Sequence, residues 1–241
     1  AKLEITQITD LGAMGRNRGA DRQRRLEALL PALQDYITER FGEGAKLGVL
    51  EKSHFCSREA GHGIWFVDNQ GSNAYEQDQA LAMVGTPAPN LTASLAQFQF
   101  THHQPNATLN SDSFRDWYGR RMGEQIVQGI HRLRPVRRGG ETLLIFLITD
   151  IDLSDVVRPG SLINFRKVCS GYFTKAAAPK KQRMREKVIT TVKSLHNGGT
   201  PLTEITTRLV AETAGISQTS AAKRRGQGQW LTFVELCLNH D

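Results

Sequence analysis

The chain has 241 residues and a net charge of +7, with 39% hydrophobic and 23% charged residues. Such a composition allows one large or two modest domains with real hydrophobic cores. No apolar run approaches the roughly 18 to 20 residues of a membrane span, and the charged N-terminus lacks the apolar core of a signal peptide. The three widely spaced cysteines argue against a disulfide framework and for a cytoplasmic protein.

The positive charge is concentrated in the last third of the chain. Residues 1–158 hold 18 basic and 19 acidic residues, a net of −1, whereas residues 159–241 hold 13 and 5, a net of +8. Pro159 and Gly160 are typical of a domain boundary. We therefore expect a neutral domain over residues 1–158 and a basic domain over residues 159–241. A basic domain indicates a polyanionic partner, most often nucleic acid, although a merely solubilising basic surface is the alternative.

The first domain is predicted to alternate strands and helices. The stretch to about Gly19 is expected to be irregular, and Asp21–Phe41 is predicted as a helix that Pro31 either kinks or restarts. Four strands are expected, at Leu47–Leu50, Gly63–Val67, Ala80–Val84 and Thr142–Thr149. Strands that alternate with helices predict an α/β fold with a parallel sheet covered on both faces. Ligands of such sheets bind in the loops after the strands, here Gly71–Asn73, Gly85–Pro87 and Asp150–Asp152.

A second long helix, starting near Ser113, carries the most informative residues. Its apolar residues recur at three- and four-residue steps, which predicts one buried face. Beside that face runs a polar stripe of Arg121, Gln125, Gln128 and Arg132. Arginine suits phosphate oxygens because it is always charged and donates through a planar fork. A solvated surface helix is the plainer interpretation of the same pattern.

The stretch from about Ala45 to Thr149 resembles the second RecA-like lobe of a superfamily 2 helicase. In that family a helix with the pattern Q-x-x-G-R-x-x-R, called motif VI, supplies arginine fingers to ATP. Gln128 matches the glutamine and Arg132 the first arginine, while His131 replaces the glycine and Arg134 comes one residue early. The resemblance therefore implies that Arg132, Arg134 and Gln128 are catalytic, with Arg132 the better match.

Two upstream segments add to the resemblance. Residues 71–87, GSNAYEQDQALAMVGTP, are similar to motif V, in which a small glycine-containing loop precedes an apolar strand and a proline. Lys46–Ser53 resembles the strand of motif IV. The motif V loop of the family touches the nucleic-acid backbone, which implies that role for Gly71, Ser72 and Asn73. The residues around this loop suggest a likeness to the helicase-like part of large replication proteins on cyanobacterial plasmids.

The basic domain is predicted to be mainly helical. One helix carries an apolar face over Met184–Leu195 with cations crowded at its front, and further helices are expected at Thr203–Ala214 and Ser217–Arg225. The segment Val210–Arg225 resembles a helix-turn-helix of DNA-binding proteins, with Gly215 at the turn, where a left-handed backbone is needed. This resemblance implies DNA contacts from Gln218, Thr219, Lys223, Arg224 and Arg225. A structural helical hairpin is the alternative.

The sequence contains no phosphate-binding loop of the form G-x-x-x-x-G-K-[ST]. An ATPase needs that loop and acidic ligands for magnesium, and Asp150 and Asp152 follow the motif VI helix, where the family has no magnesium site. The adjacent His102 and His103 lack a third ligand at a suitable spacing. No metal site is therefore predicted in this chain.

Together these features predict a RecA-like parallel sheet with flanking helices, followed by a helix-turn-helix or winged-helix domain. We expect the C-terminal part of an ATP-dependent DNA helicase or replication protein, inactive alone, whose ATP and Mg²⁺ are bound mainly by a first RecA-like lobe. The expected partners are DNA and that lobe, with no membrane. Two alternatives stay open: a non-enzymatic DNA-binding initiator or regulator with an α/β partner domain, and a RecA-like interaction module without a ligand.

Overall fold

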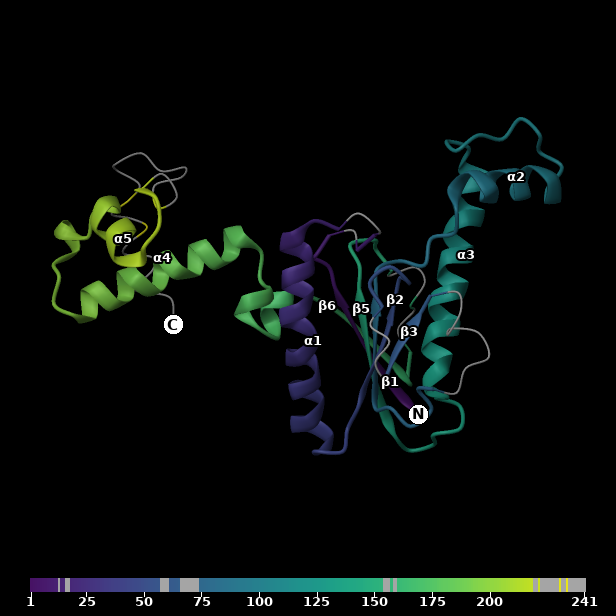
Figure 1. Ribbon diagram of the computed structural model, residues 1–241, viewed down its shortest axis with the longest axis horizontal. Helices are drawn as coiled ribbons and strands as arrows, with labels where there is room; N and C mark the ends of the chain where they lie inside the picture. The colour runs from purple at the N-terminus through teal and green to yellow at the C-terminus, as the bar shows by residue number, and fades with distance from the viewer. Residues whose placement is uncertain are drawn as a thin grey trace. The chain divides into compact units, whose positions relative to one another are not determined.

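The computed structural model (Figure 1) describes residues 1–12, 14–15, 18–56, 61–65, 74–153, 157, 160–218, 221, 230 and 233. The chain divides into two compact units, Ala1–Ala177 and Ala178–Asp241. This division falls later than the boundary expected after residue 158. The reason is that Ile163–Val168 forms the last strand of the sheet and pairs with the first strand of the chain.

One parallel sheet of six strands organises the first unit. The strands are β1 (Lys2–Ile8), β2 (Leu47–Glu51), β3 (His62–Ile64), β4 (Ala80–Val84), β5 (Thr142–Ile148) and β6 (Ile163–Val168). Their spatial order is β3-β2-β4-β5-β1-β6, and all neighbouring strands are parallel. Three expected strands are found as β2, β4 and β5, and β3 lies in the fourth expected region. The prediction of an α/β fold with a parallel sheet is confirmed.

The prediction of an irregular N-terminal stretch is wrong, because Lys2–Ile8 forms β1 between β5 and β6. Four of the seven residues in β1 are polar, so its composition does not indicate a buried strand. Pairing on both edges buries Ile5 and Ile8, and it buries Gln7 completely as well. The place of this segment in the sheet, rather than its own residues, makes it a strand.

β6 is a second strand that the sequence pattern did not predict. It lies at the edge of the sheet with β1 as its neighbour, and none of its residues is fully buried. Edge strands tolerate charged residues, and β6 contains Arg166 and Lys167. The fading strand signal after residue 159 therefore reflects an edge position and not the end of the sheet.

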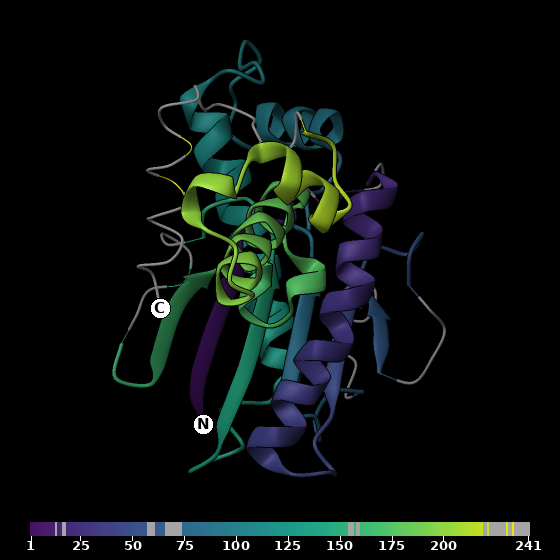
Figure 2. The same cartoon turned by 90° about the vertical axis from the view of Figure 1, so that its left-hand side faces the viewer.

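Helices cover both faces of this sheet (Figures 1 and 2). The helix α1 (Ala20–Phe41) continues through Pro31 and packs Leu26, Leu29 and Leu33 against one face. The opposite face is covered by α3 (Asp112–Ile130), whose Ile126 and Ile130 belong to a second core. The remaining helices of the unit are α2 (Leu91–Thr101) and three short 3₁₀ helices, η1 (His131–Leu133), η2 (Ser170–Tyr172) and η3 (Lys175–Ala177).

The second unit is built from helices around a small core of its own. Its elements up to residue 218 are α4 (Lys180–Asn197), η4 (Leu202–Glu204) and α5 (Thr207–Ala214). The core consists of Val188, Val192, Ile205, Val210, Trp230 and Phe233. α5 ends at Gly215, whose φ of 60° is left-handed, as expected for the turn. Thr219, Lys223, Arg224 and Arg225 lie outside the described residues, so the helix-turn-helix stays a prediction.

Gly85 lies directly after β4, where the chain passes the segment around Met14. Its φ is +76°, and an added Cβ would lie 2.6 Å from the Met14 carbonyl oxygen. We expect Gly85→Ala to lower the free energy of unfolding by roughly 3 kcal/mol, since backbone strain and a backbone clash act together. Gly140→Ala is the matched control, because φ there is +81° but an added Cβ meets nothing within 4 Å. The control should cost about 1 kcal/mol. Urea unfolding measures both variants, and equal losses would contradict the close approach at Gly85.

Candidate functional site

The chain after α3 forms a turn that carries the predicted phosphate-binding arginines. Gly129 lets α3 approach the sheet, because an added Cβ there would clash with the Met83 side chain. The helix then tightens into η1, whose Leu133 is completely buried. Arg132 precedes this anchor and is half-buried. The packing of α3 and Leu133 therefore fixes the backbone from which Arg132 projects.

Arg134 follows the same anchor in an unusual backbone conformation. Its φ of 52° and ψ of 46° are left-handed, which is uncommon for a residue other than glycine. Two features hold it there: its amide donates to the His131 carbonyl at 3.0 Å, and Pro135 follows it. A proline disfavours the right-handed helical conformation in the residue before it. Strained residues of this kind persist where the surroundings determine them, and they concentrate at functional sites.

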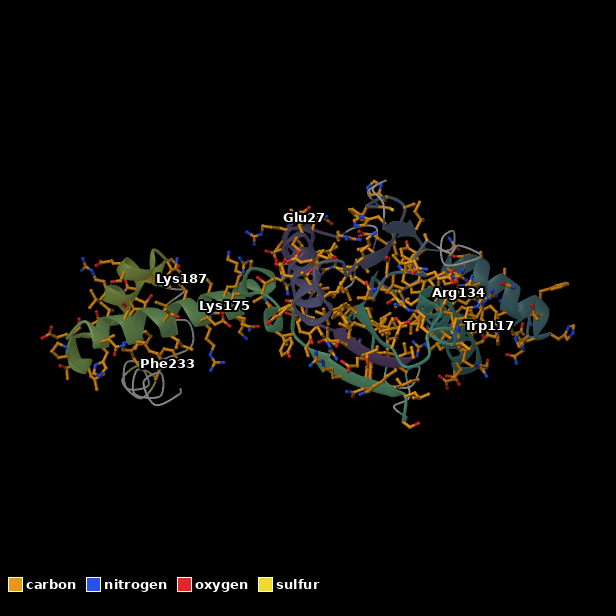
Figure 3. The ribbon with its side chains drawn as sticks, turned by 90° about the horizontal axis from the view of Figure 1, so that it is seen from below. Glu27, Trp117, Arg134, Lys175, Lys187 and Phe233 are labelled. Atoms are coloured by element: carbon orange, nitrogen blue, oxygen red, sulfur yellow. The ribbon has the colours of Figure 1, made fainter. Side chains whose placement is uncertain are left out.

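Gln128 lies one helical turn before Arg132. The two residues lie in different elements, because α3 ends at Ile130 and Arg132 belongs to the 3₁₀ helix η1. Gln128 is exposed. Figure 3, which views the sheet from below, shows Arg134 at the end of α3, on the face of the sheet opposite Glu27 of α1. The three predicted catalytic residues thus lie within seven positions of each other, around one helix end.

This helix end lies at the amino-terminal edge of the sheet. The N-terminal amino group of Ala1, directly before β1, donates to the Pro135 carbonyl at 2.8 Å. The guanidinium of Arg138 donates to the carbonyl of Asp78, which precedes β4, at 2.5 Å. Figure 1 shows the same relation, with the end of α3 beside the N-terminus of the chain. The loops Gly85–Pro87 and Asp150–Asp152 follow strand ends, so they lie at the opposite, carboxyl-terminal edge.

The structure separates the arginines of the run 132–138 into different roles. Arg138 is bound internally: it donates to the Glu141 carboxylate at 2.6 Å and 2.9 Å and to the carbonyls of Glu76 and Asp78. The hydrogen bond from Arg138 holds the pKa of Glu141 below its ordinary value. Arg137 is exposed. Arg138 therefore joins the loop before β4 to the loop before β5. Arg132 lies in η1 and Arg134 directly follows it.

At the carboxyl-terminal edge, a buried ion pair joins Arg18 to Glu51, the last residue of β2. The Arg18 side chain is 0% exposed and that of Glu51 is 6% exposed. The Arg18 guanidinium also lies 3.8 Å from the centre of the Phe55 ring. Burial raises the pKa of Glu51, and the charges of Arg18 and His62 oppose that rise. Sequence reasoning missed this pair, although an acidic residue at the end of an apolar strand is the signal that could have indicated Glu51.

A network of neutral groups closes the same edge between β1, β4 and β5. Gln7 Nε2 donates to the Thr149 carbonyl at 3.1 Å and to the Ile151 carbonyl at 2.6 Å. The hydroxyl oxygens of Thr86 and Thr149 lie 2.7 Å apart.

An ion pair adds to these neutral contacts. Asp152, considered above as a possible metal ligand, pairs with Lys167 of β6 at 2.7 Å. These contacts hold the loops after β4 and β5 in place.

The predicted nucleic-acid contacts are only partly within the described residues. Gly71, Ser72 and Asn73 lie outside them, as do Thr219, Lys223, Arg224 and Arg225. Gln218 is described, and it is exposed at the start of a helical segment after Gly215. The structure therefore tests neither the motif V loop nor the proposed recognition helix.

Within the described parts of the chain, no group of three or more His, Cys, Asp or Glu side chains is arranged to hold a metal ion. The helices described there also include none with the length and apolar character needed to cross a bilayer. In comparisons with known proteins, no family model matches the chain. Neither a curated protein nor a solved structure shows significant similarity to it.

Removing Arg18 should leave Glu51 as an uncompensated buried charge. We expect Arg18→Met to lower the free energy of unfolding by about 3–5 kcal/mol near neutral pH. Without Arg18 the pKa of Glu51 should rise further, since burial already raises it. A carboxyl whose folded pKa exceeds its unfolded value begins to destabilise the fold above the unfolded pKa, and the loss is complete above the folded pKa. The cost of Arg18→Met should therefore shrink as the pH falls from about 7 toward about 5.

Urea unfolding over this pH range measures the effect. Arg24→Met is the control, because Arg24 pairs with Asp21 at 2.8 Å on the exposed surface of α1. That variant should cost less than about 1 kcal/mol. A cost of Arg18→Met that does not change with pH would show that Glu51 does not carry the lost stability.

Proposed function

We propose that this chain is the second RecA-like lobe of an ATP-dependent DNA helicase or replication protein. The observation that supports the proposal is the turn after α3, which carries Gln128, Arg132 and Arg134 at the amino-terminal edge of the sheet. This is the edge opposite to the strand ends where ligands of parallel sheets usually bind. Burial of Ile130 and Leu133 on one side of this turn leaves two half-buried arginines beside them. The six-stranded parallel sheet with helices on both faces is compatible with a RecA-like lobe.

The proposed chemistry is electrostatic. A first lobe, which would hold Mg²⁺ and the phosphate-binding loop, presents the γ-phosphate of ATP to this edge. Arg132 donates to the γ-phosphate oxygens, where charge develops during transfer. Gln128 can hold a water molecule or a phosphate oxygen beside it, because an amide both donates and accepts. Arg134 contributes a second positive charge from its left-handed backbone position.

The absence of a phosphate-binding loop in the sequence supports the proposal that a first lobe binds the phosphates and this chain supplies the arginines. A lobe with arginines but no such loop can complete an ATP site without building one. The proposed DNA contacts come from two places. The first is the loop of Gly71, Ser72 and Asn73, and the second is the basic C-terminal unit with Gln218, Thr219, Lys223, Arg224 and Arg225.

A second candidate function is a non-enzymatic DNA-binding initiator or regulator with an α/β partner domain. The observation that favours it is the end of α5, where Gly215 takes the left-handed backbone that a helix-turn-helix requires. The excess of 13 basic over 5 acidic residues after residue 158 also favours DNA as its partner. On this candidate, Arg132 and Arg134 have no role in phosphoryl transfer.

The two candidates differ in what Arg132→Lys does to a protein that joins this chain to a first RecA-like lobe. Lysine keeps the charge but loses the planar fork, and arginine fingers contribute about 10³ to 10⁵ in rate in related phosphoryl transfers. We expect ATP turnover to fall by roughly 100-fold or more, while DNA affinity and thermal unfolding stay unchanged. Arg137→Lys is the matched control, because Arg137 is exposed and lies past the turn. If both variants keep turnover within about twofold, Arg132 is not an arginine finger.

DNA binding through the predicted recognition helix has a separate test. Replacing Lys223, Arg224 and Arg225 with alanine should weaken the affinity of the full chain for duplex DNA. The slope of log affinity against log salt should also flatten, because fewer counterions are released. Fluorescence anisotropy with labelled duplex DNA at several salt concentrations measures both effects. An unchanged affinity would leave the helix-turn-helix assignment without support, whatever the result for Arg132.

A further inference from the structure

The first two turns of α4 form a strongly basic surface, which we call the α4 arm and define as residues 180–187. Its cations are Lys180, Lys181, Arg183, Arg185 and Lys187, against the single acidic residue Glu186. All the buried residues of α4 lie beyond this segment, from Val188 onward. Lys180, Lys181, Arg185 and Lys187 are exposed, and Figure 3 labels Lys187 at the end of the arm. The arm therefore stands outside the core of its own unit.

The charges of the arm oppose the stability of the helix that carries them. A helix N-terminus bears a partial positive charge and favours acidic residues, yet the first turn of α4 has none and lacks a side-chain cap. Like charges also stand four residues apart, as Lys181 with Arg185 and Arg183 with Lys187, and such pairs repel. Sequences that break local rules in this way do so mainly at functional sites.

Four of the five cations of the arm have no ion pair within the part of the chain that the structure describes. In the described residues, no ion pair involves Lys180, Lys181, Arg185 or Lys187. Glu186 accepts a hydrogen bond from Gln182 at 3.1 Å. Two exposed cations on other helices are paired, Arg24 with Asp21 and Arg208 with Glu212, each at 2.8 Å. The positive charges of Lys180, Lys181, Arg185 and Lys187 are thus available to an external anion.

We infer that the α4 arm binds the phosphate backbone of nucleic acid. Its cations span roughly 10 Å along the helix axis, which equals about three steps between phosphates of one DNA strand, each a rise of about 3.4 Å along the duplex axis. Arginine and lysine are the usual contacts to such phosphates. This inference rests on the DNA-binding part of the proposed function and adds a third contact surface to it. It does not depend on the role of Arg132.

An anionic membrane surface is the main competing partner, and the apolar side of α4 argues against it. Helices that lie on membranes insert an exposed apolar face into the lipid. The apolar residues of α4 that could form such a face, Val188 and Val192, are buried in the core of the second unit with Trp230. None of the described residues of this unit is a large, exposed hydrophobic residue. The arm therefore carries positive charge but has no exposed apolar face that could insert into a membrane.

The test uses the full chain and a fluorescein-labelled DNA duplex. In the arm variant, Lys181→Gln, Arg185→Gln and Lys187→Gln are combined. The control combines Arg24→Gln, Arg115→Gln and Arg120→Gln, which removes the same charge from exposed positions of α1 and α3. At about 0.1 M salt we expect the arm variant to bind roughly tenfold or more weakly and the control within about twofold. The slope of log affinity against log salt should flatten by about 0.9 for each lost phosphate contact.

Thermal unfolding of the DNA-free variants separates binding from folding. If the charges of the arm only stabilised the helix, the arm variant would unfold at a lower temperature. We expect the same or a higher unfolding temperature, because removing like charges relieves repulsion. Added duplex should raise the unfolding temperature of the natural chain more than that of the arm variant.

Three results would overturn the inference. Equal losses of affinity in the arm variant and the control would mean that net charge alone attracts DNA. Undiminished binding by the arm variant would place the DNA contact elsewhere. Binding to vesicles that contain phosphatidylserine, lost in the arm variant while DNA binding persists, would identify a lipid surface instead. None of these results bears on ATP turnover, so the Arg132 experiment stays independent.

Discussion

The pairing of β1 between β5 and β6 is the constraint on which the rest of the first unit depends. All seven residues of β1 pair with β5, and six of them also pair with β6. This pairing joins the N-terminus of the chain to segments more than 130 residues away, and it makes a single sheet with two buried faces. Because all the strands are parallel, their ends form two chemically distinct edges.

The two edges use their polar groups differently. At the carboxyl-terminal edge the Arg18–Glu51 pair and the Gln7 amide are buried and bonded to the protein, so they hold loops in place. At the amino-terminal edge Arg138 is bound in the same way, but Arg132 and Arg134 remain half-buried at the end of α3. A buried charge needs partners inside the protein, which Arg18 and Arg138 have.

In the second unit, the charged residues at the start of α4 do not stabilise the fold, unlike the buried charged groups of the first unit. The apolar core of the second unit lies beyond residue 187 of α4 and in the segments that pack on it, so the first two turns of α4 contribute cations but no fully buried residue. Natural sequences place residues that oppose local stability where function requires them. The left-handed backbone of Arg134 in the first unit is a similar case. A residue other than glycine disfavours this conformation, and the surrounding structure keeps it there.

By itself, the sequence determined the α/β class, the helices α1 and α3, and the strands β2, β4 and β5, because burial of their apolar residues is visible as local periodicity. It also predicted that Gln128 and Arg132 share one helix face, whereas α3 ends at Ile130 and Arg132 lies in the 3₁₀ helix η1. Only the tertiary structure made a strand of the polar segment Lys2–Ile8, gave Arg138 its internal partners and paired Arg18 with Glu51. These features depend on contacts between distant segments, and their energies come from pairing and burial that no local pattern contains.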